Sequence, residues 1–434
     1  MTIAVIIATG RTGTGADPVP TAVLPCGDGP EAPTVLTRLC DQLATLKVPE
    51  RRIVTRPDLA PALRKDGHDV IECEDTAADL REIARLTRGT TAPVVLLPGD
   101  LVANGELLSR LLVDARTVPV AGTAPGLLRV GRARVETLAE LAERLAVDLF
   151  GGPPGDRPAA VPKHTAELLR LGLARDGVPV APCPGEGLVC VRAGTEDAAL
   201  AALAEAGSVD EDRIRMDAAI NPGGGPVGTR TAGRAQAVTR WAAREGLTPN
   251  TVTLISLAVG LLAALWFAAG TRTGMVVGAV LFYLAFVLDC VDGQLARYRR
   301  MVSPLGAWMD AIGDRAKEYA VYAGLAVGAA AAPPDSSVHA GSVWGLAVAA
   351  MALQTVRYMV DSSGLESAPA PPPLDGRAGW AQRLLTLPIG ERFALISVTA
   401  ALGNARMTFA ALLAWGSVAA LYSLVGRIAR AVAR

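Results

Sequence analysis

Hydrophobic residues are distributed in two different ways along this chain of 434 residues. In the first half, short apolar runs such as those in IAVIIA (3–8) and VVLLPGD (94–100) alternate with stretches of helical periodicity near 33–46, 75–88, 104–114, 133–148 and 163–175. Buried strands that alternate with helices are typical of an α/β domain with a mostly parallel sheet. We therefore predict such a domain over residues 1–212.

The second half contains much longer apolar segments. We place six of them near 250–270, 274–296, 308–332, 338–360, 389–404 and 407–427. About 20 apolar residues in a helix match the thickness of the hydrocarbon core of a bilayer. Residues 247–434 are therefore predicted to form an all-α bundle of six membrane spans, of which the fifth is short.

A Gly/Pro-rich stretch, NPGGGPVG, lies within 213–229 and predicts a linker between the two halves. The next segment, 230–246, interleaves arginines with alanines, Val238 and Trp241. This pattern favours an amphipathic helix at an anionic membrane surface, with a solvated helix as the alternative. Residues 213–246 thus form the predicted connection.

Charge and cysteine content exclude some classes of function. Lys plus Arg and Asp plus Glu both total 42, so net charge gives no indication of a nucleic-acid partner. The six cysteines form no CxxC pair and only three histidines occur, which argues against structural zinc and a disulfide framework. A reducing, cytosolic setting fits the first domain.

The placement of arginines predicts the orientation of the bundle. Three arginines lie in the turn 297–300 and four in the helix before the first span, and others lie in the loop 361–392 and at the C-terminus. The connections on the other side carry only Arg272 and Arg406. By the positive-inside rule, the first domain, the 297–300 turn and the C-terminus face the cytosol.

The second and third apolar segments share the strongest motif in the chain, D-x2-D-G-x2-A-R-x8-G-x3-D-x3-D. Helical spacing places each half of this motif on one face of its own helix. If the two helices pack antiparallel across a short turn, four carboxylates converge: Asp289, Asp292, Asp310 and Asp314. Their mutual repulsion calls for cations, and oxygen ligands without His or Cys suit Mg²⁺, Mn²⁺ or Ca²⁺.

Two such ions about 3.5–4 Å apart would hold the oxygens of a phosphoryl displacement. Gly293 and Ala296 remove side-chain bulk beside the carboxylates, and Arg297 offers a planar fork for phosphate. The simpler interpretation is that the aspartates cap helix ends or pair with nearby Arg and Lys. That interpretation suits one aspartate better than four at this spacing, because carboxylates inside a membrane segment are costly.

All eight motif positions match the CDP-alcohol phosphotransferases, which this half of the chain resembles. The resemblance implies a homodimeric integral membrane enzyme that transfers a substituted phosphate from a CDP-linked donor to an alcohol and releases CMP. It implies that Asp289, Asp292 and Asp310 bind two Mg²⁺ or Mn²⁺ ions, and that Asp314 is a further ligand or the general base. The nucleotide site would be lined by Gly293, Ala296, Arg297 and Gly306.

The first half resembles the sugar-phosphate nucleotidyltransferases. Gly10, Arg11 and Gly13 approximate the loop of that family, and Asp100 after a hydrophobic strand approximates its metal ligand. Thr21 stands where the family has a lysine, so we expect a degenerate or repurposed domain. Lys163 is an alternative cation, although a surface role suits it better.

We expect CDP-diacylglycerol as the donor and a polyol or polyol phosphate as the acceptor, in phospholipid biosynthesis. The candidate acceptor-binding residues lie at predicted span ends and are Lys317, Arg357 and Arg392. One alternative is a bifunctional enzyme that makes CDP-inositol and joins it to inositol phosphate. Another is a cation-coupled transporter, and in a third the first domain is a non-catalytic scaffold.

Overall fold

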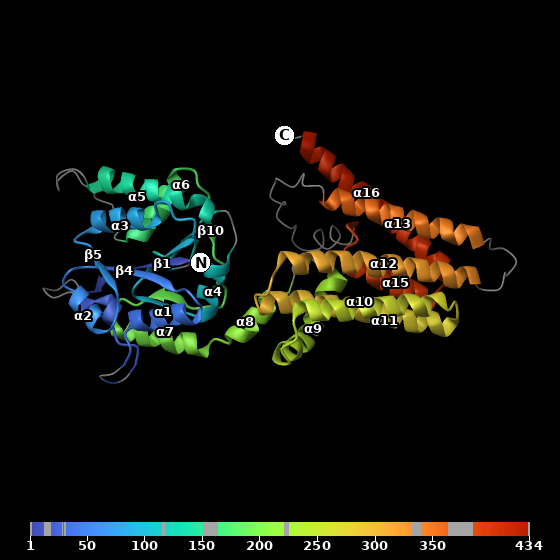
Figure 1. Ribbon diagram of the computed structural model, residues 1–434, viewed down its shortest axis with the longest axis horizontal. Helices are drawn as coiled ribbons and strands as arrows, with labels where there is room; N and C mark the ends of the chain where they lie inside the picture. Colours follow the sequence, from blue (N-terminus) through green and yellow to red (C-terminus); the bar gives the residue numbers. More distant parts are fainter. Residues whose placement is uncertain are drawn as a thin grey trace. The chain divides into compact units, whose positions relative to one another are not determined.

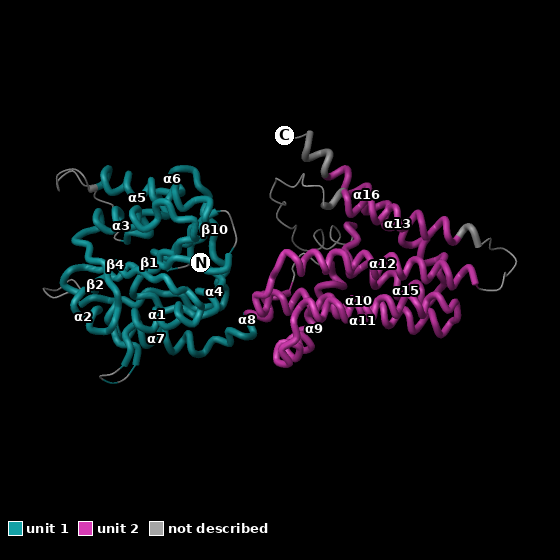
Figure 2. Tube along the Cα trace, in the orientation of Figure 1, with its two compact units in different colours: residues 1–214 teal, residues 215–434 magenta. Residues whose placement is uncertain are grey.

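The computed structural model describes residues 2–12, 19–27, 29, 32–114, 118–122, 124–150, 164–220, 225–331, 340–362 and 385–432. The chain folds into two compact units, unit 1 (Met1–Ile214) and unit 2 (Arg215–Arg434) (Figure 2). Each unit has its own hydrophobic core. Gly13, Lys163 and most of the predicted 361–392 loop lie outside the described residues.

Unit 1 is built on a seven-stranded sheet with the order β10-β8-β9-β6-β1-β4-β5 (Figure 1). The strands β5, β4, β1 and β6 are parallel, whereas β9 runs antiparallel to both of its neighbours. Their bounds are β1 (Ile3–Ala8), β4 (Glu50–Thr55), β5 (Val70–Glu72), β6 (Val94–Pro98), β8 (Val120–Ala121), β9 (Leu128–Val130) and β10 (Ala181–Pro182). The predicted α/β domain with a largely parallel sheet is confirmed.

Helices cover both faces of this sheet (Figure 1). One core packs leucines of α1 (Val35–Thr45), α2 (Ala60–Lys65) and α4 (Gly105–Val113) against the sheet. The other core packs α3 (Thr76–Thr87), α5 (Val135–Phe150) and α6 (Thr165–Arg175). Because β1 lies between them, all six of its residues are buried, which explains its continuous apolar sequence.

Smaller elements complete unit 1. They are β2 (Arg11–Thr12), β3 (Val19–Pro20), β7 (Leu101–Ala103), β11 (Cys190–Arg192), the short helices at Thr21–Val23 and Arg132–Arg134, and α7 (Glu196–Ser208). The strand β11 pairs antiparallel with β7 in a separate two-stranded sheet. The strand order reverses at β1, so the carboxyl ends of β1 and β6 form the crevice in which α/β sheets bind ligands.

Unit 2 is helical in all of its described elements (Figure 1). After α8 (Glu211–Ala218), which crosses the boundary between the units, come α9 (Pro226–Arg244), α10 (Pro249–Ala268), α11 (Arg272–Tyr298), α12 (Pro304–Ala331), α13 (Ala340–Ser362), α15 (Ile389–Leu402) and α16 (Ala405–Val432). The predicted connection 213–246 therefore contains most of α8 and all of α9.

Three helical segments among the described residues are long and apolar enough to cross a membrane: α10, α11 and Ala405–Gly426 of α16. Helix α15 has 14 residues, too few to cross a bilayer as a straight helix. Helix α12 has 28 residues but carries a run of charged residues in its first half. The six predicted spans are therefore not confirmed.

The helix α10 packs closely along both α11 and α12. Small residues allow this close approach: a Cβ added to Gly324 of α12 would lie only 2.3 Å from the carbonyl oxygen of Ala264 in α10. Aromatic rings link the other helices, with Phe282 of α11 stacked on Phe393 of α15 at 4.2 Å between ring centroids. The acidic motif helices are thus fixed in a packed core.

The helix α9 has a buried face of small residues and an exposed face. Its buried residues include Ala235 and Ala242, which pack in a cluster with α10 and α11. Trp241 and Val238 are exposed, as are Arg230, Arg234 and Arg244. The predicted amphipathic helix exists, and its contact with a membrane stays a prediction.

Candidate functional site

A tight turn joins the two helices that carry the acidic motif. The N–H of Met301 donates to the carbonyl of Ala296 and that of Arg300 to the carbonyl of Arg297, with Arg300 at φ 55°. This is the Schellman arrangement that ends a helix. Ser303 then accepts a hydrogen bond from the N–H of Gly306, in the first turn of α12. The chain therefore reverses within a few residues.

The reversal brings three of the four aspartates together. Single oxygens of Asp289, Asp292 and Asp310 all lie within 4.8 Å of one another. Asp292 is buried, and Asp289, Asp310 and Asp314 are half-buried. Close carboxylates in a packed core repel one another strongly, so this arrangement requires nearby positive charge.

Helix α10 supplies polar groups that the sequence motif does not contain. The hydroxyl of Thr253 donates to Asp292 at 2.6 Å, and that of Ser256 donates to Asp289 at 2.6 Å. Both residues are buried and lie one turn apart on one face. Their spacing in an otherwise apolar helix was the available signal, and our sequence reasoning missed it.

Lys317, predicted to bind the acceptor, lies inside the acidic cluster. Its ammonium group is 2.5 and 2.6 Å from the two carboxylate oxygens of Asp289 and 3.1 Å from Asp314. It also donates to Ser256 at 2.9 Å. Lys317 is therefore a direct partner of the aspartates.

The predicted nucleotide-site residues surround the same region. Gly293 lies beside Arg297: a Cβ on Gly293 would be 3.3 Å from Nη2 of Arg297. The Nε of Arg297 donates to the carbonyl of Ala219 at 2.6 Å. Ala296 lies in the last turn of α11, and Gly306 lies near Asn250 of α10.

The other two predicted acceptor-binding residues make contacts within the protein. Arg357 of α13 is buried and donates to the carbonyl of Thr386 at 2.7 Å. Arg392 of α15 forms an ion pair with the buried Glu318 at 3.2 Å, and Tyr322 donates to the same carboxylate at 2.6 Å. The charge of Arg392 is thus already balanced inside the bundle.

The predicted metal ligand of unit 1 has a different environment. Asp100 follows β6 at the crevice, and both of its carboxylate oxygens accept hydrogen bonds from Arg192, each at 2.7 Å. Thr21 also donates to Asp100, at 2.7 Å. A Cβ on Gly10 would lie 2.5 Å from Thr21 Oγ1 and 2.9 Å from Asp100 Oδ2, so only glycine fits there. The guanidinium of Arg192 thus engages both carboxylate oxygens of Asp100, which are the atoms that a metal ion would have to bind.

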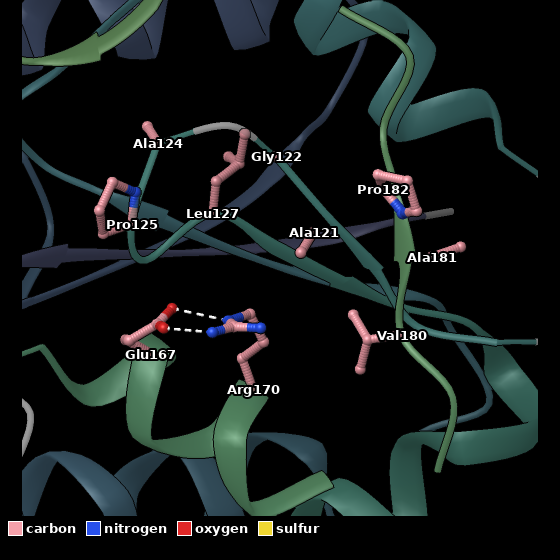
Figure 3. A pocket seen from close by; sticks show the side chains of 10 residues that line it. All are labelled: Ala121, Gly122, Ala124, Pro125, Leu127, Glu167, Arg170, Val180, Ala181 and Pro182. Carbon is pink, nitrogen blue, oxygen red and sulfur yellow. Dashed lines mark hydrogen bonds and ion pairs between the residues drawn. The ribbon is translucent and has the colours of Figure 1, made fainter. Parts of the chain in front are cut away.

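The remaining predicted loop residue of unit 1, Arg11, pairs with Asp58. A separate surface cavity of about 330 Å³ lies between α6 and the β8–β10 edge of the sheet (Figure 3). Its charged lining residues, Glu167 and Arg170, pair with each other at 2.6 Å. The charged residues of this cavity therefore pair with each other and not with Asp100.

Residues 246–422 match the family model for CDP-alcohol phosphatidyltransferase. This segment contains the whole acidic motif and the α10 residues that bind it. This segment is therefore similar to the CDP-alcohol phosphatidyltransferase family. The matched segment also contains two of the three helices that are long and apolar enough to cross a membrane, and most of the third.

Several known proteins are similar to part of the chain. A bifunctional IPC transferase and DIPP synthase from Rubrobacter xylanophilus is 42% identical over 83 residues, 19% of this chain and 18% of that protein. The phosphatidylinositol phosphate synthase of Streptomyces avermitilis is 31% identical over 151 residues, 35% of this chain and 59% of that protein. The chain thus matches less than a fifth of the length of the bifunctional relatives.

A solved structure gives a further comparison. The crystal structure of Mycobacterium tuberculosis phosphatidylinositol phosphate synthase with CDP-DAG bound covers 45% of this chain and 91% of that one, with 22% identity and a TM-score of 0.33.

The donor set of the acidic cluster suits a hard divalent cation. Three carboxylate oxygens within 4.8 Å of one another are ligands of the kind that Mg²⁺ and Mn²⁺ prefer. Thr253 and Ser256 hold two of these carboxylates by hydrogen bonds, which is the usual support for metal ligands. The residues of unit 2 therefore fit such an ion, whereas Asp100 of unit 1 does not.

Proposed function

We propose that this protein transfers the phosphatidyl group of CDP-diacylglycerol to an alcohol acceptor and releases CMP, in a reaction that depends on Mg²⁺ or Mn²⁺. The observation that carries the proposal is the convergence of Asp289, Asp292 and Asp310 on one small volume. The match of residues 246–422 to the family model supports the reaction type. The donor and the acceptor alcohol are our inference.

The proposed roles follow from the positions of the side chains. Asp289, Asp292 and Asp310 would hold a divalent cation, which would neutralise the diphosphate of the donor. Gly293, Ala296 and Gly306 keep bulk away from this region, and Arg297 at the end of α11 provides a guanidinium for phosphate. The bundle would thereby position a CDP group next to the carboxylates.

Asp314 is the proposed general base. It is half-buried and lies one helical turn beyond Asp310, outside the group of three oxygens. In the proposed step, the acceptor oxygen forms a bond to the phosphorus of the phosphatidyl group while the bond from that phosphorus to CMP breaks. Asp314 takes the proton of the acceptor hydroxyl. The reaction exchanges an anhydride bond for an ester bond and needs no further reactant.

The environment of Asp100 favours a lipid-linked donor over CDP-inositol. A bifunctional enzyme would need a cytidylyltransferase centre in unit 1. There, Arg192 engages both oxygens of Asp100, and Thr21 stands where the resembled family has a lysine. We infer that unit 1 does not turn over CTP. With CTP and inositol phosphate, the full-length protein should release no diphosphate above background, and release would revive the bifunctional alternative.

The proposed location is the cell membrane, with unit 1, the acidic cluster and the C-terminus on the cytosolic side. Arginines near the α11–α12 turn support this orientation. Helix α12 also exposes Leu305, Trp308 and Ile312 on one face, as expected of a helix that contacts lipid. A homodimer remains part of the proposal through family resemblance.

The test uses purified full-length protein in detergent with Mg²⁺, CDP-diacylglycerol and a panel of alcohols and polyol phosphates. We expect CMP release that requires both the ion and one acceptor, together with a product whose mass equals phosphatidyl plus that acceptor. A transporter would release no CMP. Turnover of CDP-inositol without turnover of CDP-diacylglycerol would contradict the choice of donor.

A further inference from the structure

Lys317 is a positive charge built into the acidic cluster. It is 1% exposed, although lysine is rarely buried without a partner. Its ammonium group has three protons and donates to both carboxylate oxygens of Asp289 and to Ser256, and it forms an ion pair with Asp314 at 3.1 Å. These contacts use the donor capacity of the group, so Lys317 has none left for an acceptor phosphate.

The neighbouring helix makes room for this side chain. A Cβ on Gly260 of α10 would lie 2.5 Å from Cγ and 2.8 Å from Cδ of Lys317. The stem of the lysine therefore passes directly over a glycine, and a larger residue at position 260 would displace it. Ser256, one turn before Gly260, accepts the hydrogen bond from the ammonium group. Helix α10 thus both admits Lys317 and fixes its charged end.

The contacts divide the four carboxylates into two groups. Oxygens of Asp289, Asp292 and Asp310 form the group that fits one divalent ion. The ammonium of Lys317 lies between Asp289 and Asp314, 2.5 Å from the first and 3.1 Å from the second. A second ion bridging Asp289 and Asp314 would have to enter this occupied position, next to a positive charge.

The balance of charges in the cluster also argues against a second ion. One divalent ion and Lys317 together supply three positive charges against four carboxylates. A second ion would bring the total to five within a packed core, where an excess of like charge is costly. We infer that the Lys317 ammonium occupies one of the two cation positions of the cluster, so that the donor-free protein binds one divalent ion per chain instead of two.

This inference rests on the proposed function and can fail separately from it. The experiment titrates Mn²⁺ into full-length protein in detergent without donor, and reads bound ions from the loss of the free Mn²⁺ electron paramagnetic resonance signal. We expect one ion per chain in the wild type. Lys317→Met and Lys317→Gln should each bind two, because the ammonium no longer holds the second position.

Lys65→Met is the matched control, because Lys65 is an exposed lysine of unit 1, and it should bind one ion. Thermal unfolding establishes that the variants fold. Two ions in the wild type would overturn the inference, as would one ion in both folded Lys317 variants. If neither variant folds, the wild-type count decides alone. CMP release by a protein that binds two ions would leave the proposed function standing, whereas no binding at all would overturn both.

Discussion

Asp100 of unit 1 and the acidic cluster of unit 2 are two solutions to the same problem, a carboxylate in a packed environment. Arg192 donates to both oxygens of Asp100, and Thr21 adds a third hydrogen bond. In unit 2, one ammonium group serves Asp289 and Asp314, while Asp310 and the rest of the cluster depend on charge from elsewhere. The charge of Asp100 is therefore compensated by its protein partners, whereas the charge of the acidic cluster is compensated only in part.

This difference shows how aspartate can stabilise the fold in one environment and suit a metal-dependent reaction in another. A guanidinium and a carboxylate match in geometry and charge, so their pair leaves nothing for a ligand. Three carboxylate oxygens that converge with insufficient positive charge require a cation, and that requirement is what a metal-dependent site exploits. We therefore propose that catalysis takes place in unit 2 and that Asp100 has a structural role.

The largest expected effect is on catalysis by unit 2. Asp310→Asn replaces an anionic oxygen of the cluster by an amide, and CMP release should fall at least about 100-fold, as for loss of a preorganised charge-stabilising group. Asp100→Asn is the matched change in unit 1 and should leave CMP release unchanged. Initial rates with CDP-diacylglycerol and Mg²⁺ measure both. Equal losses of CMP release in the two variants would contradict the proposed difference between the two units.

The next effect concerns the stability of unit 1. Arg192→Ala leaves the buried Asp100 without its partner and should lower the free energy of unfolding of unit 1 by about 3 kcal/mol. All six tryptophans lie in unit 2, so pulsed labelling of the buried thiols of Cys40 and Cys73 in denaturant is the suitable measurement. The control Arg132→Ala removes an exposed arginine and should have little effect. A comparably small change in Arg192→Ala would argue against a structural pair.

A smaller effect is expected from the hydrogen bonds of α10. Thr253→Val removes the donor to Asp292 and should reduce CMP release about 10-fold, since an unpaired buried charge typically costs 1–3 kcal/mol or more. Thr273→Val, at an exposed position of α11, serves as the control. An unchanged rate in Thr253→Val would show that α10 does not position the cluster.

The smallest effect concerns pH and unit 1 alone. Burial raises the pKa of Cys40 and of Cys73 to about 11, from an ordinary value of 9.0. The unfolded chain releases these protons more easily, so unit 1 should lose stability as the pH rises from about 9 to about 11. Thiol labelling across that range tests this, with Cys40→Ala and Cys73→Ala as the variants in which the pH dependence weakens. A pH dependence in both variants that is identical to that of the wild type would contradict it.

The sequence was most informative where functional residues lie only a few positions apart in the chain. Asp289, Asp292, Asp310 and Asp314 could be placed on two helix faces because the helical repeat alone determines them. Alternation of strands and helices likewise predicted the α/β unit. The number of spans could not be settled this way, because α12 places charged residues in a helix that packs on α10.

Partners distant in the sequence could not be predicted. Arg192 reaches Asp100 only because β11 pairs with β7, and 92 residues separate the two. Lys317 reaches Asp289 only because α10 carries Gly260 at the crossing point. Both contacts depend on tertiary packing, and both change the interpretation of residues that the sequence had identified. From these contacts we infer a structural role for Asp100, and a role for Lys317 in the acidic cluster in place of the predicted acceptor site.

The most direct test of the account asks which unit binds the divalent cation. Mn²⁺ binding to the full-length protein would be measured for the wild type, Asp310→Asn and Asp100→Asn under identical conditions. We predict that Asp310→Asn loses the bound ion and that Asp100→Asn retains it with unchanged affinity. Retention by Asp310→Asn together with loss in Asp100→Asn would place the cation in unit 1 and contradict the account.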